Sequence, residues 1–210
     1  MKKTIFFLFS VTTFASASVV TVSNIADEMT SAVLLDNTAT PILSGDAFIH
    51  IGFFGDVASE GADPTNFVST FTTFTSGAIS NSLAGGFLEQ NFDGPTLNQT
   101  SPFVGEGVSV IVTDAADLAS STAFAAFSTG STFAADVQSI NNATPTAGLL
   151  TANAVFGVTE SGSFEREVPS PFGTQIQTFE SGVALTAVPE PSAALLAGLA
   201  LVGGLVRRRR

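Results

Sequence analysis

The sequence predicts a mainly β protein, an antiparallel β-sandwich or partly open barrel with one short helix. An N-terminal signal peptide and a C-terminal single transmembrane-like helix are expected to frame it. Short runs rich in Val, Ile, Phe and Thr recur about eight to ten times between Gly, Pro, Asn and Asp clusters, as in all-β domains. One run alternates clearly: Val108, Val110 and Val112 fall on one strand face, and Ser109 and Thr113 on the other.

The first 17 residues have the three parts of a secretory signal peptide. Lys2 and Lys3 form a positive start, residues 5–14 are mostly apolar, and Ala15 and Ala17 are the small residues at the −3 and −1 positions. This pattern predicts export through the Sec translocon and cleavage by signal peptidase after Ala17. The alternative is a buried N-terminal strand or helix.

Residues 18–187 form the expected β-rich domain. Seven of the strand-like runs lie at 31–35, 47–54, 107–114, 121–129, 132–138, 152–164 and 173–188, and turn-forming residues separate them. In the last run Gln175 and Gln177 alternate with Ile176 and Thr178, which indicates a strand with two different faces.

One segment of the domain has helical spacing instead. Four apolar residues recur there at intervals of three or four: Phe67, Phe71, Phe74 and Ala78. Asp63 suits an N-cap and Pro64 the first helical position. We therefore expect one short amphipathic helix, with its apolar stripe toward the core, covering an open end of the sandwich.

The domain is strongly acidic. Of the 18 Asp and Glu residues, all but Glu190 lie within 18–187, where Arg166 is the only Lys or Arg. Such a domain repels nucleic acid, so we expect no nucleic-acid partner. The charge either keeps an exported protein soluble or attracts divalent cations, amines or basic surfaces.

Residues for common catalytic and metal-binding chemistry are scarce. His50 is the single histidine and the chain has no cysteine, which excludes disulfides and the usual zinc ligand sets. We expect His50 to be structural, at a strand edge or rim. No lysine follows Lys3, so Schiff-base chemistry is excluded from the domain.

Two carboxylate pairs remain as alternatives. Asp114 and Asp117 are three residues apart, in a spacing open to calcium, although a solvated loop is the preferred interpretation. Glu165 and Glu167 share a strand face beside Arg166 and are interpreted as a surface charge cluster at a strand end. We therefore expect no enzyme, no metal site and no cofactor.

The C-terminal segment 188–210 combines three parts in order. Val188, Pro189, Glu190 and Pro191 form a motif that proline keeps out of a helix, and residues 192–206 carry no charge. As a helix, those fifteen residues span about 22 Å, less than the ~30 Å hydrocarbon core. The chain ends with a basic cluster: Arg207, Arg208, Arg209 and Arg210. The cluster favours a cytoplasmic end and only transient inner-membrane insertion; a plain C-terminal anchor is the alternative.

This three-part segment resembles the PEP-CTERM sorting signal of Gram-negative bacteria. The resemblance implies recognition by an exosortase, removal of the tail, and delivery to the cell surface or the extracellular polysaccharide matrix. It covers only residues 188–210 and implies an address, not an activity. The resulting hypothesis is an exported surface or matrix protein with a structural or interaction role. Alternatives are a polysaccharide- or calcium-binding module, a carboxylate-based hydrolase and a simple anchored envelope protein.

Overall fold

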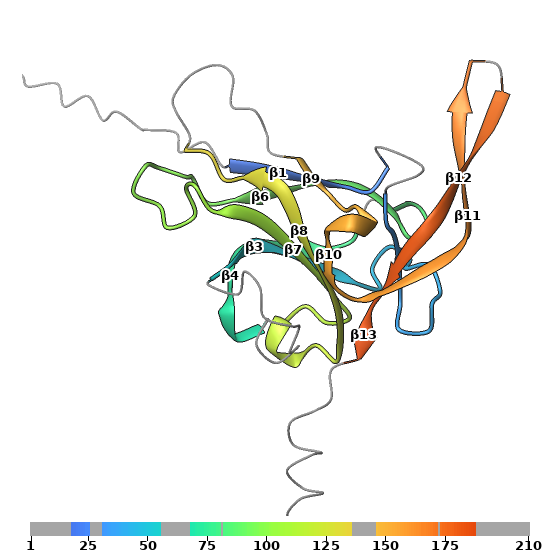
Figure 1. The fold of residues 1–210 in the computed structure, drawn as a ribbon. Helices are drawn as coiled ribbons and strands as arrows, with labels where there is room; N and C mark the ends of the chain where they lie inside the picture. The colour runs from blue at the N-terminus through green and yellow to red at the C-terminus, as the bar shows by residue number, and fades with distance from the viewer. Residues whose placement is uncertain are drawn as a thin grey trace, which may run out of the picture.

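The computed structural model describes residues 18–25, 31–55, 68–80, 82–135, 146–171 and 173–187. Within these ranges the chain folds mainly into β-strands arranged as three open sheets, which confirms the predicted mainly β class (Figure 1). None of the helices in these ranges has the length and apolar character needed to cross a membrane. The expected signal peptide at 1–17 and C-terminal segment at 188–210 lie outside the described residues.

The first sheet has four strands in the order β5-β6-β1-β9. Their bounds are β5 Ser82–Ala84, β6 Phe87–Gly94, β1 Ser18–Ser23 and β9 Thr146–Gly148. Ser18, the residue directly after the predicted signal-peptidase site, lies in β1, and its Oγ accepts a 3.2 Å hydrogen bond from the Leu97 N–H.

The second sheet has six strands in the order β10-β8-β7-β3-β4, with β13 also paired to β8. Their bounds are β10 Ala154–Phe156, β8 Ala123–Thr132, β7 Gly107–Thr113, β3 Phe48–Phe54, β4 Phe71–Ala78 and β13 Thr186–Ala187. The third sheet, β11-β12-β2, comprises β11 Val158–Ser170, β12 Gly173–Ala184 and β2 Val33–Leu35.

The prediction of a purely antiparallel architecture is wrong for two strand pairs. β9 lies parallel to β1, and β2 lies parallel to β12. These two short strands come from distant parts of the chain and are not joined to their neighbours by hairpins, so their direction is not restricted to antiparallel.

The main core lies between the first and second sheets. Val20 and Phe92 from the first sheet pack in one cluster with Ile51, Val110 and Phe127 from the second. The expected alternation in β7 is confirmed, because Val108, Val110 and Val112 all belong to this cluster. The opposite face of β7 is also covered: Ile111 packs with Phe71, Phe124 and Ala126 in a separate cluster.

The predicted amphipathic helix is wrong at its C-terminal half. Residues 71–78 form strand β4, which pairs with β3, while the described residues 68–70 are helical and 63–67 lie outside the described ranges. Phe71 and Phe74 do not share a stripe, because they belong to clusters on opposite faces of the sheet. The Thr-rich composition of this segment, with its high β propensity, outweighs the helical spacing.

Two other expected strands differ in extent. The run at 132–138 is a strand only at Thr132, and the described residues 133–135 are irregular. The run at 152–164 divides at Gly157, whose φ of 123° is open mainly to glycine, into β10 and β11. Two single-turn 3₁₀ helices, η1 Leu118–Ser120 and η2 Thr151–Asn153, stand where the sequence suggested turns or strand ends.

Candidate functional site

The C-terminal exit of the domain is fixed by backbone pairing on two sides. The Leu185 N–H donates to the Leu35 carbonyl at 2.9 Å, and the Leu185 side chain is buried. In β13, Thr186 and Ala187 then pair with Phe124 and Ala123 of β8. The candidate sorting motif therefore starts at Val188, directly after a residue that is held in a sheet.

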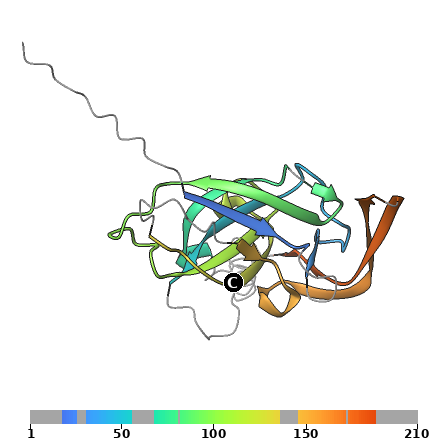
Figure 2. The same cartoon turned by 90° about the horizontal axis from the view of Figure 1, so that it is seen from above.

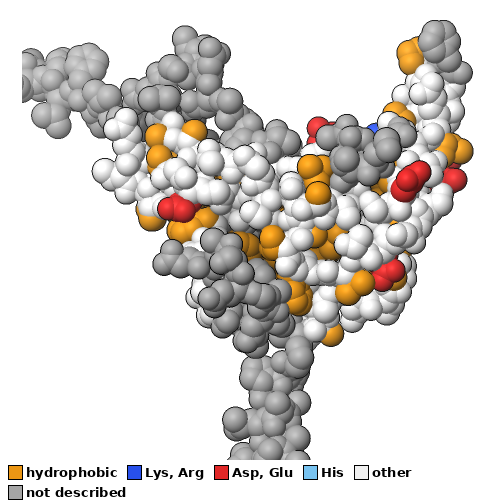
Figure 3. Space-filling view, viewed as in Figure 1, with side chains coloured by type: hydrophobic (Ala, Val, Ile, Leu, Met, Phe, Trp, Pro, Cys, Tyr) orange, Lys and Arg blue, Asp and Glu red, His pale blue; other side chains and the backbone are white. Residues whose placement is uncertain are grey.

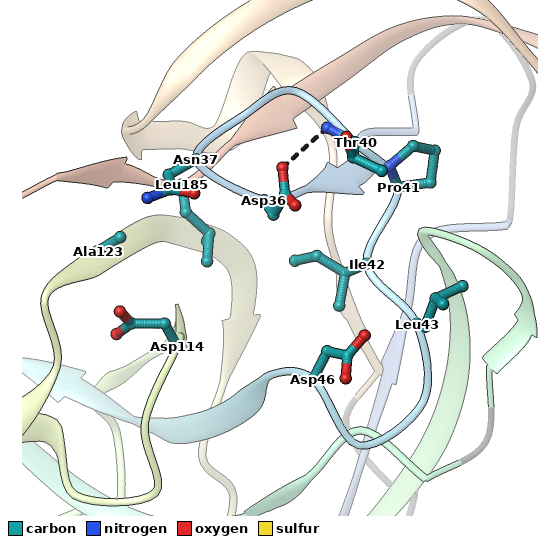
Figure 4. Close-up of a pocket in the computed structure, with 10 residues that line it drawn as sticks. All are labelled: Asp36, Asn37, Thr40, Pro41, Ile42, Leu43, Asp46, Asp114, Ala123 and Leu185. Atoms are coloured by element: carbon teal, nitrogen blue, oxygen red, sulfur yellow. Dashed lines mark hydrogen bonds between the residues drawn. The ribbon is translucent and has the colours of Figure 1, made fainter.

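A pocket of about 180 Å³ lies beside this exit (Figure 4). Ala123 and Leu185 line it, and the rest of the wall comes mainly from the segment between β2 and β3: Asp36, Asn37, Thr40, Pro41, Ile42, Leu43 and Asp46, together with Asp114. The three aspartates stand at separate points of the rim, and Ile42 and Leu185 contribute apolar surface between them. The site thus combines negative charge with an apolar wall.

The Asp36 side chain mainly stabilises the loop that follows β2. Its Oδ1 accepts hydrogen bonds from the Thr38 N–H at 2.8 Å, the Thr38 hydroxyl at 2.7 Å and the Thr40 N–H at 2.9 Å. Partial burial acts to raise the pKa of Asp36, but the bonds from Thr40 and Thr38 together hold it below its ordinary value. The loop also accommodates Ala39 at a φ of 61°, which the three bonds to one oxygen help to stabilise.

Asp114 and Asp117 do not converge on a common ligand position. Asp114 accepts from the Thr122 N–H at 2.9 Å and from the Thr122 hydroxyl, closing the loop between β7 and β8. Asp117 caps η1 by accepting from the Ala119 N–H at 3.2 Å. Across the described part of the chain, no three His, Asp or Glu side chains are grouped so that they could hold a metal ion.

His50 lies inside the second sheet, so the prediction that it stands at a strand edge or rim is wrong. Its strand, β3, pairs on both sides, with β4 and β7, and the side chain is only 3% exposed. Nε2 lies 3.1 Å from the Thr113 hydroxyl, which itself donates to the Ala115 carbonyl at 2.7 Å. Because that hydroxyl has one proton, His50 Nε2 carries the hydrogen and donates to Thr113.

The burial of His50 predicts a pH-dependent stability. Burial lowers its pKa, against smaller opposing effects of the Ala115 carbonyl and Asp117. A lowered folded-state pKa means that the unfolded chain binds the proton more readily, so the free energy of unfolding falls as pH drops from 7 toward 5. The slope of one such group is at most about 1.4 kcal/mol per pH unit.

Urea titrations at several pH values measure this effect, and His50→Gln is the matched control. Glutamine keeps an N–H donor for Thr113 but does not titrate, so the free energy of unfolding of this variant is expected to fall less steeply between pH 7 and 5 than that of the unmodified protein. Asp36 does not interfere, because its lowered pKa places its contribution at more acidic pH. An equal slope in both proteins contradicts the assignment.

The Glu165–Glu167 pair lies on the hairpin formed by β11 and β12. Both glutamates are exposed, and Arg166 between them is half-buried and points to the other face, where it pairs across the hairpin with Gln177. The predicted surface charge cluster therefore lies within β11 and not at a strand end, and its positive and negative side chains are on opposite faces of the strand.

The comparisons with known proteins concern the C-terminal segment alone. Residues 187–210 match the family described as the PEP-CTERM protein-sorting motif, in agreement with the resemblance seen in the sequence. No curated protein and no solved structure matches the chain. The chain therefore carries a PEP-CTERM sorting motif, which implies an exported protein that is sorted to the cell surface by an exosortase.

The described domain and the segment that matches the PEP-CTERM family overlap at one residue. Ala187 is both the last residue of β13 and the first residue of the matched segment. The individual motif residues (Val188, Pro189, Glu190 and Pro191), the four terminal arginines, and Ala15 and Ala17 of the signal peptide lie outside the described residues. Their separate roles remain predictions.

Proposed function

We propose that this chain is an exosortase substrate whose domain has a structural or interaction role at the cell surface or in the extracellular polysaccharide matrix, without catalysis. The observation that carries the proposal is the PEP-CTERM match at 187–210, which begins at the last strand of the domain. Sec-dependent export, signal-peptidase cleavage after Ala17 and transient membrane insertion of residues 192–206 complete the proposed route.

The short distance between domain and motif supports a structural role. Ala187 is paired with β8, and Pro191 follows only four residues later. Cleavage of the tail near the motif leaves the domain almost directly at its point of attachment, with little chain between them. A domain held this closely presents a narrow range of orientations to its surroundings.

The placement of the candidate catalytic groups supports a role without catalysis. His50 is buried in the sheet and hydrogen-bonded to Thr113, whereas a general base must come within hydrogen-bond reach of a substrate proton. Asp114 and Asp117 are committed to loop hydrogen bonds with Thr122 and Ala119.

Alanine substitution of Pro189, Glu190 and Pro191 together tests the proposed sorting. Because a sorting enzyme reads the motif as an address, we expect the surface-exposed fraction of the protein to fall at least about ten-fold. The measurement is protease accessibility of the chain on intact cells. Pro102→Ala, which removes an exposed proline of the domain, is the control and is expected to leave this fraction unchanged. Unchanged surface exposure of the triple variant would overturn the proposal.

A further inference from the structure

The β11–β12 hairpin, called the arm below, extends well beyond the rest of the fold (Figure 2). Its base is anchored: Phe179 is fully buried and its ring lies 4.7 Å from that of Phe87, centroid to centroid. Beyond the Phe164–Phe179 pair, six further residue pairs continue to Ser170 and Gly173. In the space-filling view the outer end of the arm stands apart from the body (Figure 3).

Among the residues that the structure describes, the outer part of the arm consists of two strands. β2 pairs with β12 at Gly182–Ala184 alone, and no other described strand pairs with β11 or with β12 nearer the tip. A two-stranded ribbon without a core of its own is marginally stable in water. It also presents the unpaired backbone groups of two strand edges, which can pair with another strand.

The two edges of the arm differ in chemistry. β11 carries Glu165, Arg166, Glu167 and Pro169, and both charge and proline discourage the addition of a strand. The facing stretch of β12, residues 174–178, reads Thr-Gln-Ile-Gln-Thr, with no charge and no proline. Ile176 is 61% exposed in it. This composition favours strand pairing.

We propose that residues 174–178 of β12 pair with the same residues of a second copy of this chain, antiparallel and about a two-fold axis through Ile176. The sequence of this edge argues for this occupant, because Thr-Gln-Ile-Gln-Thr reads the same in both directions and is therefore complementary to itself in an antiparallel pair. The edge is also uncharged, so the excess of acidic residues in the two copies is not brought together there. This inference does not depend on sorting by the C-terminal motif.

The two-fold register keeps the acidic residues apart. With Ile176 opposite Ile176, Gln175 lies opposite Gln177 and Thr174 opposite Thr178, so no charge faces another across the junction. The glutamates of the two β11 strands are then separated by three strand spacings, about 14 Å, which exceeds the screening length of physiological salt. The contact also buries two exposed isoleucines. Because the two-fold axis pairs the same strand edge of both copies, the assembly is complete with two chains.

The absence of cysteine from the chain makes this register directly testable. Ile176→Cys in the exported protein isolated from its host places two thiols opposite each other across the proposed axis, within reach of a disulfide. We expect oxidation to give a covalent dimer at least about ten-fold faster than for Leu43→Cys, a 58% exposed position outside the arm. Equal rates for the two variants would refute the register.

Ile176→Lys tests whether the edge itself drives association. The introduced lysine stands opposite Glu167 within its own hairpin, so the fold gains an opposite-charge pair while two lysines oppose each other between copies. In sedimentation velocity we expect a dimer for the unmodified protein and a monomer for this variant, with Leu43→Lys remaining dimeric. A monomeric unmodified protein at about 100 μM, or a dimeric Ile176→Lys, overturns the proposal.

Discussion

Asn24→Asp is expected to lower the free energy of unfolding by at least about 3 kcal/mol. Asn24 is fully buried at the end of β1, and its Nδ2 donates to the Ala32 carbonyl at 2.8 Å and the Gly86 carbonyl at 2.7 Å. Its Oδ1 accepts from the Leu88 N–H at 2.7 Å. One amide thus joins the approach to β2, the turn before β6, and β6 itself.

The aspartate has nearly the same shape but lacks both Nδ2 donors. It either places a carboxylate against two carbonyl oxygens or takes up a proton at a cost in free energy. Asn91→Asp is the matched control: Asn91 is exposed and its Oδ1 accepts from the Thr21 hydroxyl, a role that aspartate retains. We expect a change within about 0.5 kcal/mol there.

Urea denaturation followed by far-UV circular dichroism measures both variants, since the chain has neither Trp nor Tyr as a fluorescent reporter. A loss below about 1 kcal/mol in the free energy of unfolding for Asn24→Asp would contradict the role of the Asn24 amide in joining these three segments.

Gly52→Ala is the second substitution with a large expected effect. Gly52 follows the register shift between Ile51 and Gly52, where β3 passes very close to β4. A Cβ at this position would come within 3.0 Å of the Thr72 backbone carbonyl group. Since a neighbouring strand must shift to make room, we expect a loss of about 2 kcal/mol or more.

Gly107→Ala and Gly130→Ala are the controls for Gly52. A Cβ at either position meets nothing within 4 Å, and neither backbone has a positive φ. We expect no loss, and a gain of up to about 1 kcal/mol from the reduced entropy of the unfolded chain. If Gly52→Ala behaved as these controls do, the close approach of β3 and β4 would be contradicted.

The strands at the centre of the second sheet could be predicted from sequence because they are apolar and uninterrupted. β3, β7 and the first half of β8 consist of small and β-branched or aromatic residues and are largely buried. β6 was not foreseen, because its Glu89, Asn91 and Asp93 face solvent and resemble turn residues in the sequence. Their strand character depends on pairing with β1, a contact distant in sequence.

The functional segments were predictable to different degrees. The sorting motif is a contiguous pattern, so its order of proline, apolar segment and arginines could be read without a structure, and the family match agrees with it. The arm could be predicted only as two strand-like runs. Its projection depends on β2 pairing with just three residues of β12, which no local pattern encodes. The pocket beside Leu185 likewise combines residues more than a hundred positions apart.

The most direct test of the proposed sorting is the intact mass of the protein isolated from its host, with and without an active exosortase. We predict a chain that begins at Ser18 and, only when the enzyme is active, ends near Pro191, with any added mass identifying the surface attachment. A chain that still ends at Arg210 in both strains would contradict the account and make residues 192–210 a permanent anchor.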